Sequence, residues 1–409
     1  MVIDLSIEIK NQVSDKEGRA KHLRMELNKK RIDFPRKATH ISKNDSSEVS
    51  LFRKEFDDHL VSEFVLKITP KGLRELVGDA SKHQSNKDAI RNMLSETGSK
   101  GINIAYPMLV NERSPNESEV DFRAFGKPSE RVLEKLFDLL DVEGFDMIIL
   151  PVSSSNGDGL DWVKMATKVF KERHADFLKE HVLSGFVPRN VMENTAITMA
   201  QYYLENGIES LTFDFDARKV PEGRMRGIID KLGTQWRKIH VHGVNVPHFD
   251  WHGTWRKSVL PAYDLLVSIY GFDSFSNLRS GKGEEEIIPS DKIKDKMNKK
   301  RYQLIDTYGM YDSDGLKKIS ETHSISCNCP TCRKIKPLEI YEKPVSLDSL
   351  ETLKMELKIH RLYSTHKEVN QFSPMIDKDK YTDHVKTKKD AANEVSSILK
   401  NLSKQKKLT

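Results

Sequence analysis

Short apolar runs alternate with longer segments of helical apolar spacing through the middle of the chain. Residues 145–152 form a nearly continuous apolar run, which is typical of a strand buried on both faces. Residues 162–178 follow with apolar residues at helical spacing, and the pattern repeats with a strand at 181–187 and a helix at 191–204. This order predicts parallel strands that are joined by crossover helices.

The same alternation continues as far as residue 276. The predicted segments are strands at 209–216, 238–244 and 272–276, and helices at 225–232 and 261–270. Repeating β–α units of roughly 30 residues build parallel sheets, and enough of them close into a (β/α)8 barrel, a fold of the α/β class. An open, doubly wound sheet is the alternative. No glycine-rich phosphate loop follows a predicted strand, which weakens a nucleotide-binding version of the open sheet.

Changes in composition divide the chain into three parts. We expect the barrel in residues 1–320, a metal-binding subdomain in 321–372 and a basic, flexible tail in 373–409. Two polar stretches inside the first part are predicted to be loops. They are 82–100, which is rich in serine, asparagine and lysine, and 281–301, which is highly charged.

Composition is typical of a soluble globular protein. Hydrophobic residues make up 37% and charged residues 31% of the 409 positions, and no apolar run reaches the length of a membrane span. The amino terminus lacks a signal-peptide pattern and the three cysteines are clustered, so we expect a cytoplasmic protein with no membrane partner. The net charge of +6 permits a nucleic-acid partner without establishing one. Lysine-rich stretches at 292–301 and 386–407 fit either phosphate binding or a solvated surface.

The cysteines of the chain fall within one six-residue segment, Cys-Asn-Cys-Pro-Thr-Cys at 327–332. Three thiolates on a short loop need a cation, and zinc takes four such ligands in a tetrahedron. A histidine on a following helix supplies the fourth ligand, and His360 is favoured over His323 and His366. The predicted ligands are Cys327, Cys329, Cys332 and His360. Four protein ligands leave no open position, so this zinc is predicted to be structural.

Several segments around this cluster match one protein family as they stand. They are Asp-Leu-Leu at 264–266, Gly-Phe-Asp-Ser-Phe at 271–275, Tyr-Gly-Met-Tyr-Asp-Ser-Asp-Gly at 308–315, the cysteine segment, and His-Arg-Leu at 360–362. Together they resemble the tRNA-guanine transglycosylase superfamily, whose members are zinc-containing (β/α)8 barrels that exchange guanine for a 7-deazaguanine base. The similarity covers about residues 205–372, while the first 200 residues match only in outline.

The resemblance implies a base-exchange transferase that acts on nucleic acid. Its partners would be guanine or a 7-deazaguanine base and either tRNA, the usual substrate of the family, or DNA. DNA is a serious option because only about 40 residues follow the zinc region, too few for the RNA-binding domain of the archaeal enzymes. The resemblance also allows a homodimer, or a heterodimer with an active homologue.

The chain departs from the family at the catalytic positions. The last barrel strand of the family reads roughly Gly-x-Asp-x-Phe-Asp, and its final aspartate is the nucleophile. The favoured register places Ser276 at that position, whereas a slip of three residues places Asp273 there. The Asp-Ser-Gly loop of the family has no match in the first 130 residues. These departures keep open a non-catalytic subunit that binds nucleic acid or pairs with an active homologue.

Acidic residues and histidines gather where predicted strands end. Barrel enzymes place catalysis at the carboxyl ends of their strands, so we predict an active site. Its residues would be Asp214, Asp216, His242 and Asp273. Buried hydrogen-bonded residues without a catalytic role, or unrelated chemistry at this cluster, are the alternatives, and His240, His242 and His248 could form a second metal site. The neighbouring aromatic residues, which could stack a base or pack in the core, are Trp236, Phe249, Trp251 and Trp255.

Overall fold

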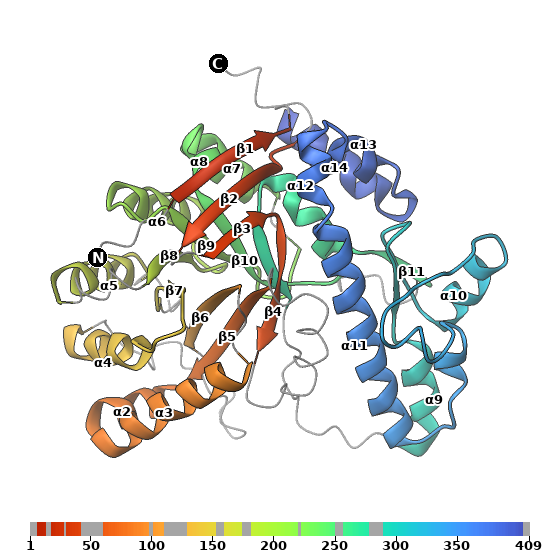
Figure 1. Cartoon of the computed structure of the whole chain (residues 1–409), viewed down its shortest axis with the longest axis horizontal. Helices are drawn as coiled ribbons and strands as arrows, with labels where there is room; N and C mark the ends of the chain where they lie inside the picture. Colours follow the sequence, from red (N-terminus) through yellow and green to blue (C-terminus); the bar gives the residue numbers. More distant parts are fainter. Residues whose placement is uncertain are drawn as a thin grey trace.

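Eight parallel strands close into a barrel in the computed structural model (Figure 1). The model describes residues 6–13, 18–27, 30–41, 60–97, 101–109, 129–152, 159–173, 181–219, 222–249, 257–277 and 289–403. The barrel strands are β4 (Arg36–Ile41), β5 (Val61–Ile68), β6 (Ile102–Leu109), β7 (Met147–Ile149), β8 (Val182–Val187), β9 (Ser210–Asp214), β10 (His240–Val246) and β12 (Ser274–Asn277). Strand β12 pairs with both β10 and β4, so the sheet has no open edge. The predicted (β/α)8 barrel is therefore confirmed.

A three-stranded antiparallel sheet covers the amino-terminal end of the barrel. It consists of β1 (Ser6–Gln12), β2 (Lys21–Leu27) and β3 (Lys30–Phe34). Lys21 donates to the carbonyl oxygen of Ile239, just before β10, and the Phe34 ring lies 5.0 Å from that of His240. This end of the barrel is closed, so a ligand would have to approach the opposite end, where the strands finish.

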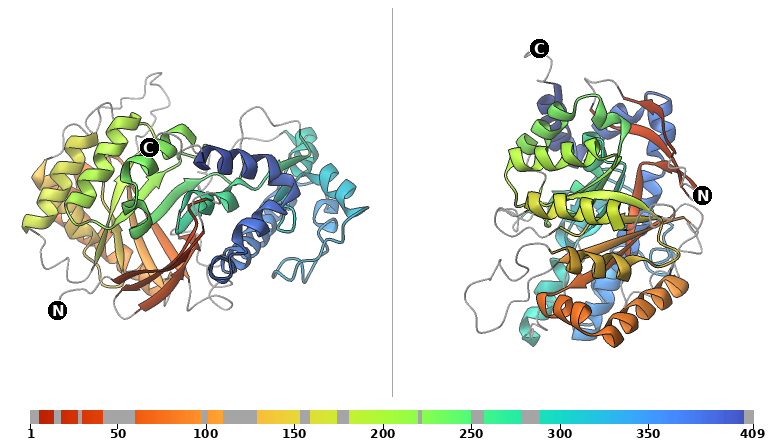
Figure 2. Two further views of the ribbon diagram at one scale, coloured as in Figure 1. Left: turned by 90° about the horizontal axis from the view of Figure 1, so that it is seen from above. Right: turned by 90° about the vertical axis from the view of Figure 1, so that its left-hand side faces the viewer.

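Helices cover the outside of the barrel (Figure 2). They are α2 (Pro70–Gly78), α3 (Ala80–Thr97), α4 (Glu130–Leu140), α5 (Gly159–Arg173), α6 (Glu193–Glu205), α7 (Glu222–Leu232) and the short α8 (Gln235–Lys238). The predicted helix at 261–270 is a 3-10 helix, η3 (Tyr263–Tyr270), which ends at Gly271 with φ +90°. None of the helices in the described ranges is both long and apolar enough to cross a membrane.

The loop prediction for 82–100 is wrong, because residues 82–97 belong to α3. The Asp79 carboxylate accepts hydrogen bonds from the backbone N–H groups of Ser81 and Lys82, which begins the helix. Ile90 and Leu94 then bury a narrow apolar stripe against the core. The polar residues that suggested a loop occupy the solvent side of this helix.

A second hydrophobic cluster lies beside the barrel and includes Met297, Tyr302, Leu316 and Leu353. Its elements are α9 (Ser290–Asn298), α10 (Ser313–Ser320), η4 (Glu339–Glu342), the long α11 (Leu347–Val369), and a small sheet of β11 (Val259–Pro261), β13 (Tyr302–Leu304) and β14 (Gly309–Tyr311). The cluster thus begins well before the expected boundary at residue 321. Of the loop predicted at 281–301, positions 290–298 form α9, and positions 281–288 lie outside the described residues.

The flexible tail predicted from residue 373 is also wrong as far as residue 403. The chain returns to the barrel through α12 (Phe372–Asp377), α13 (Tyr381–Lys386), η5 (Lys389–Ala391) and α14 (Ala392–Ser403). Val395, Ile398 and Leu402 share one face of α14 and are buried in the main core. Lysines dominate the composition of this segment, but the apolar spacing determines its structure.

Candidate metal centre and candidate active site

The four predicted metal ligands come together in the structure. One ligand atom from each of Cys327, Cys329, Cys332 and His360 lies within 4.8 Å of all the others. The His360 Nδ1 atom is 3.4 Å from the Cys327 Sγ and 3.5 Å from the other two sulfurs. Tetrahedral zinc, with sulfur at about 2.3 Å and nitrogen at about 2.0–2.1 Å, separates the two atom types by about 3.6 Å. The donor set and its spacing therefore fit a metal ion of this kind.

Surrounding groups orient the His360 ring. Its Nε2–H donates to the Gln303 carbonyl oxygen at 2.8 Å, which leaves Nδ1 free to bind a metal. The Tyr302 ring stacks on the imidazole with ring centroids 3.9 Å apart, and its hydroxyl lies 3.3 Å from the Cys332 Sγ. Both contacting residues lie in β13, so the small sheet positions the ring that α11 presents.

The two competing histidines have other partners. His323 Nε2 lies 3.5 Å from a carboxylate oxygen of Asp306, and His366 Nε2 lies 2.9 Å from the Thr39 hydroxyl. Neither belongs to the four-residue group. His360, rather than either of these histidines, therefore lies with the three cysteines in a group that could hold a metal ion.

The predicted catalytic residues lie at three different levels of the barrel. Asp273 precedes β12 and lies at the closed, amino-terminal end. Its Oδ2 is 3.1 Å from the Lys21 ammonium and accepts a hydrogen bond from the Val241 N–H at 2.8 Å. Burial raises the pKa of Asp273 to about 6, although Lys21 opposes the shift. Since barrel enzymes place chemistry at the other end, this position favours a structural role.

His242 lies at the middle level, inside the barrel. A continuous chain of hydrogen bonds passes through it and crosses the interior. In order, the distances are Glu63 to His242 2.8 Å, His242 to Ser274 2.7 Å, Ser274 to His240 3.0 Å, His240 to Ser210 2.9 Å, Ser210 to Ser184 2.9 Å and Ser184 to Thr212 2.7 Å. All seven side chains are buried. Barrel interiors are usually filled by branched apolar residues, so this polar chain is a distinctive feature.

The pKa shifts indicate how protons are arranged in this chain. Burial opposes ionisation of Glu63, but hydrogen bonds from His242 and His40 outweigh it and lower the pKa of Glu63 to about 2. Burial holds the pKa of His240 well below its usual value, so this ring is neutral. A neutral His240 donates through one nitrogen and accepts through the other. With an ionised Glu63 at one end as an acceptor, each side chain of the interior hydrogen-bond chain can then find a donor or an acceptor.

Asp214 lies at the end of the barrel where the strands finish, as the last residue of β9. Its Oδ1 accepts from the Asn245 amide at 2.8 Å and from the Asp216 N–H at 2.9 Å. Burial raises the pKa of Asp214 to about 6, with the Asn245 hydrogen bond opposing the shift. A carboxyl poised near neutral pH in such a position is a candidate for acid–base chemistry.

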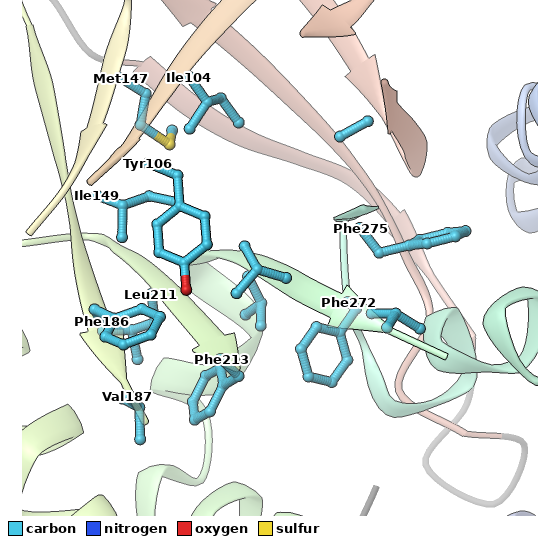
Figure 3. Close-up of a cluster of buried hydrophobic side chains, with 14 of the residues drawn as sticks. Ile104, Tyr106, Met147, Ile149, Phe186, Val187, Leu211, Phe213, Phe272 and Phe275 are labelled. Atoms are coloured by element: carbon cyan, nitrogen blue, oxygen red, sulfur yellow. The ribbon is translucent and has the colours of Figure 1, made fainter. Parts of the chain in front are cut away.

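Tyr106 approaches Asp214 from β6 on the inner side of the barrel. Figure 3 shows its ring beside Ile149 and Phe186, and the centroid distance to Phe186 is 5.6 Å. Burial, and then the Asp214 charge, raise the pKa of the Tyr106 phenol well above its usual value, so it stays protonated. The sequence interpretation did not single out Tyr106, because a tyrosine in an apolar strand carries no catalytic signal.

Three non-glycine residues with positive φ meet beside Asp214. They are Asp216 at +47°, Ala217 at +54° and Asn245 at +56°. The Ala217 N–H donates to the Asn245 carbonyl oxygen, so the two loops support each other. Alanine in this region costs conformational energy that the surrounding structure must offset, and such strain concentrates at functional sites. The Asp216 side chain itself is 62% exposed and lies 3.7 Å from Arg218, outside the buried group.

Ser276 lies in β12, and its buried hydroxyl has no hydrogen-bond partner among the described residues. Side chains alternate along a strand, so Ser276 faces inward like Ser274. Asp273 precedes the strand and Ser276 lies within it. The inner face of this strand therefore presents the Ser276 hydroxyl and not the Asp273 carboxylate.

Two predictions remain, a second metal site of three histidines and a set of aromatic residues beside it. His240 and His242 serve the interior chain, whereas His248 hydrogen-bonds to Asp264 at 3.0 Å, so the described structure does not bring the three together as a metal site. Trp236 is buried and donates to the Tyr270 carbonyl oxygen, and Phe249 is also buried. Trp251 and Trp255 lie outside the described residues.

Glu63 and Lys21 are two of the buried charged residues that sequence reasoning missed. Glu63 interrupts the apolar run Val-Ser-Glu-Phe-Val at 61–65, and an acid within a buried strand is the signal that could have marked it. Lys21 has no comparable signal, because its partner Asp273 is more than 250 positions away.

Comparison with known proteins adds no relative. No protein-family model matches the chain, and no curated protein matches it.

Proposed function

We propose that this chain is a transglycosylase-like protein that exchanges guanine for a 7-deazaguanine base in nucleic acid. The observation that carries the proposal is Asp214, a partly buried carboxyl with a pKa of about 6 at the carboxyl ends of the strands of a closed barrel. The Cys3His cluster that follows the last barrel strand supports it as well, because the resembling family combines these two features. The strained loop residues beside Asp214 mark the same end of the barrel.

In this proposal Asp214 moves the proton that base exchange requires. When the bond between the ribosyl carbon and guanine breaks, its electron pair leaves with guanine, protonated Asp214 gives its proton to the departing base, and the ribosyl carbon is left as an oxocarbenium ion. A ring nitrogen of the incoming base then bonds to that carbon and loses its N–H proton to the Asp214 carboxylate, which restores the starting state. Because the two half-reactions mirror each other, one carboxyl with a pKa near neutrality can serve as acid and then as base.

The test is incorporation of radiolabelled guanine into separate pools of tRNA and duplex DNA. We expect label in one pool, and we expect Asp214→Asn to abolish it while Asp273→Asn, in the fraction that folds, retains it. Ser276→Ala shows whether that hydroxyl takes part. Absence of label in both pools with the native chain would overturn the exchange function.

A non-catalytic role is the second candidate, and it rests on a specific observation. The Asp273 carboxylate is engaged by Lys21, and Ser276 is the residue that the favoured alignment with the resembling family places at the nucleophile position. A subunit of this kind would bind nucleic acid or pair with an active homologue without turnover. Sedimentation of the purified chain, alone and mixed with such a homologue, tests it. A chain that stays monomeric and binds neither tRNA nor DNA would exclude this role.

We also propose zinc as the ion of the Cys3His cluster. Thiolate and imidazole donors in a tetrahedral arrangement suit zinc, and four protein ligands leave no position for a reacting water. When bound, the ion would join the cysteine loop to α11. Its role is then structural, and the chemistry belongs to the barrel.

A further inference from the structure

Hydrogen bonds join the loops that follow β9 and β10, two strands that lie side by side (Figure 1). Val244 of β10 pairs with Asp214, the last residue of β9. The pairing continues beyond the strand, because the Phe215 N–H donates to the Val244 carbonyl oxygen at 3.0 Å. The Ala217 N–H likewise donates to the Asn245 carbonyl oxygen at 3.0 Å. These backbone contacts hold Asn245, which is buried, beside the Asp214 carboxyl.

Asn245 has a backbone conformation that few residues adopt. Its φ of +56° lies in the left-handed region, where a Cβ atom is strained and asparagine is better tolerated than most residues. Glycine would meet the same backbone requirement at no steric cost. A side chain is therefore present at a position where the backbone alone favours glycine, and its contacts indicate what it does.

The Asn245 side chain contacts one oxygen of the Asp214 carboxyl. Its amide donates to Asp214 Oδ1 at 2.8 Å, and the Asp216 N–H donates to the same oxygen at 2.9 Å. Oδ2 has no hydrogen bond to any residue that the structure describes. A proton on Oδ1 would displace one of the two N–H donors, because both lone pairs of that oxygen are in use. The proton of a neutral Asp214 therefore lies on Oδ2.

Ionisable side chains surround Asp214 without donating a hydrogen bond to it. They are Tyr106 in β6, Arg189 after β8, Asp216 after β9 and Arg224 in α7. In β10 the nearest is His242, two residues before Val244, and it hydrogen-bonds to Glu63 and Ser274. The two arginines donate to backbone carbonyl oxygens of the loops, Arg189 to that of Phe215 at 2.9 Å and Arg224 to that of Pro188 at 2.7 Å. Within the described ranges, Asn245 is thus the side-chain donor to Asp214.

We infer that Asn245 is a positioning residue for Asp214. Its amide fixes the Oδ1 oxygen, which leaves Oδ2 as the oxygen that carries and delivers the proton. A hydrogen bond to a carboxylate favours the ionised form, so Asn245 opposes burial and allows Asp214 to lose its proton as well as to hold it. Delivery of the proton to a base rests on the proposed function, whereas the positioning of the carboxyl does not.

Two variants of the full chain test the inference. Asn245→Gly removes the amide and suits the left-handed backbone, so the two loops can keep their conformation. Asn245→Asp keeps the size of the side chain but replaces the amide by a second carboxyl. Asp379→Gly is the matched control, because Asp379 also has a positive φ, +53°, but is exposed and lies between α12 and α13. The native chain and each variant are also prepared with Asp214→Asn.

The first readout is urea unfolding of each pair of proteins, with and without Asp214→Asn, between pH 4 and pH 8. The difference in stability within a pair reports the ionisation of Asp214. Burial raises the pKa of Asp214 to about 6 in the folded chain. The carboxyl therefore stabilises the native chain less and less as the pH rises from about 4, and the difference becomes constant above about pH 6.

We expect Asn245→Gly to raise the pH at which this difference becomes constant by about one unit, because the ionised carboxyl loses a hydrogen bond. Asn245→Asp should raise it as well, since a second carboxylate repels the first. Asp379→Gly should leave it at about pH 6. A side chain at position 245 that only filled space would lower stability equally at every pH, and the aspartate would replace it without a shift.

The second readout is incorporation of radiolabelled guanine over the same pH range. We expect the optimum of Asn245→Gly to lie about one pH unit above the native optimum, because the same carboxyl must hold and release the proton.

The stability measurements decide the inference without turnover. If both Asn245 variants keep the native pH dependence, or if the native difference does not change with pH, Asn245 does not position Asp214. A shifted pH dependence in a chain that incorporates no label would keep the positioning role and count against base exchange. An unshifted one in a chain that incorporates label would do the reverse.

Discussion

The metal centre and the barrel interior are both polar groups in buried surroundings, but they are built in opposite ways. The metal centre takes three ligands from one six-residue segment and the fourth from a single helix. The interior chain takes its seven side chains from five strands, β5, β8, β9, β10 and β12. The first is encoded by local spacing, and the second depends on the register of the whole barrel.

This difference predicts different responses to damage. A closed metal shell forms or fails as a unit, because the affinity of the ion depends on all four ligands. The interior chain is a series of hydrogen bonds, each of which contributes modestly when satisfied and costs more when its partner is removed. Substitutions should therefore have all-or-none effects at the metal centre and graded effects inside the barrel.

The largest effect is expected from Cys329→Ser. This substitution removes a buried thiolate ligand, and structural zinc sites contribute about 10–16 kcal/mol of apparent binding free energy in small zinc domains. We expect the metal to be lost and the part of the chain that contains α9 to α11 to become sensitive to protease, while the barrel stays folded. Metal content and limited proteolysis check both points.

His323→Ala is the matched control for this prediction. His323 competed with His360 as fourth ligand, and the structure gives it Asp306 as its partner instead. The variant should keep its metal content. Loss of the metal in this variant, or its retention in Cys329→Ser, would contradict the ligand set.

The next effect in size concerns the Lys21–Asp273 pair at the closed end of the barrel. Asp273→Asn leaves the buried Lys21 ammonium without its counter-charge, and breaking a buried pair in this way costs about 3–5 kcal/mol. Urea unfolding should show that loss of stability. The double variant Lys21→Met with Asp273→Leu should recover most of it, because no charge is then left buried. A single variant as stable as the native chain would remove the structural role that we assign to Asp273.

Features that depend on local spacing could be predicted from the sequence, whereas features that depend on the register of the barrel could not. The second half of the barrel was predictable because its strands and helices carry their own apolar periods, as in 145–152 and 162–178. The elements before residue 145 were not assigned from the sequence, and most of α3 was predicted to be a loop. The grouping of the three cysteines was predictable because their spacing alone brings them together. Glu63 was not, since its contact with His242 spans 179 positions and depends on how β5 and β10 are placed around the barrel. The prediction of a flexible tail was wrong because it relied on the lysine-rich composition and not on the spacing of the three apolar residues that bury α14.

The sequence also did not show at which end of the barrel Asp273 lies. The motif places it next to the last strand, but a motif does not indicate which end of the strand faces the ligand. That distinction depends on the boundary of β12 and on the sheet that covers the amino-terminal end.

Two serines of β12 provide a graded test inside the barrel. Ser274→Ala breaks the chain between His240 and His242 and leaves polar atoms of both rings unsatisfied, which should cost about 1–3 kcal/mol. Ser276→Ala removes a hydroxyl that has no described partner, so its stability should change by less than about 1 kcal/mol. Urea unfolding of the two variants measures the difference. Equal losses of stability in the two variants would mean that the hydrogen bonds of Ser274 do not stabilise the fold.

The pH dependence at Asp214 is expected to be smaller than the effect of Ser274→Ala, and it bears most directly on the proposed chemistry. Burial raises the pKa of this carboxyl to about 6 in the folded chain, against about 3.9 when unfolded. The stability that it contributes is therefore fully present below about pH 4 and is lost as the pH rises through about 6. Asp214→Asn cannot ionise, so the native chain should lose about 1–2 kcal/mol relative to this variant between pH 4 and pH 7.

Urea unfolding of both proteins at the two pH values isolates this carboxyl, because every other group titrates in both. If the difference between the two proteins is the same at both pH values, Asp214 is as well solvated in the fold as in the unfolded chain. A carboxyl of that kind would be fully ionised at neutral pH and could not deliver a proton to a departing base. The comparison would then leave the metal centre as the better-supported site, and the non-catalytic role would become the stronger proposal.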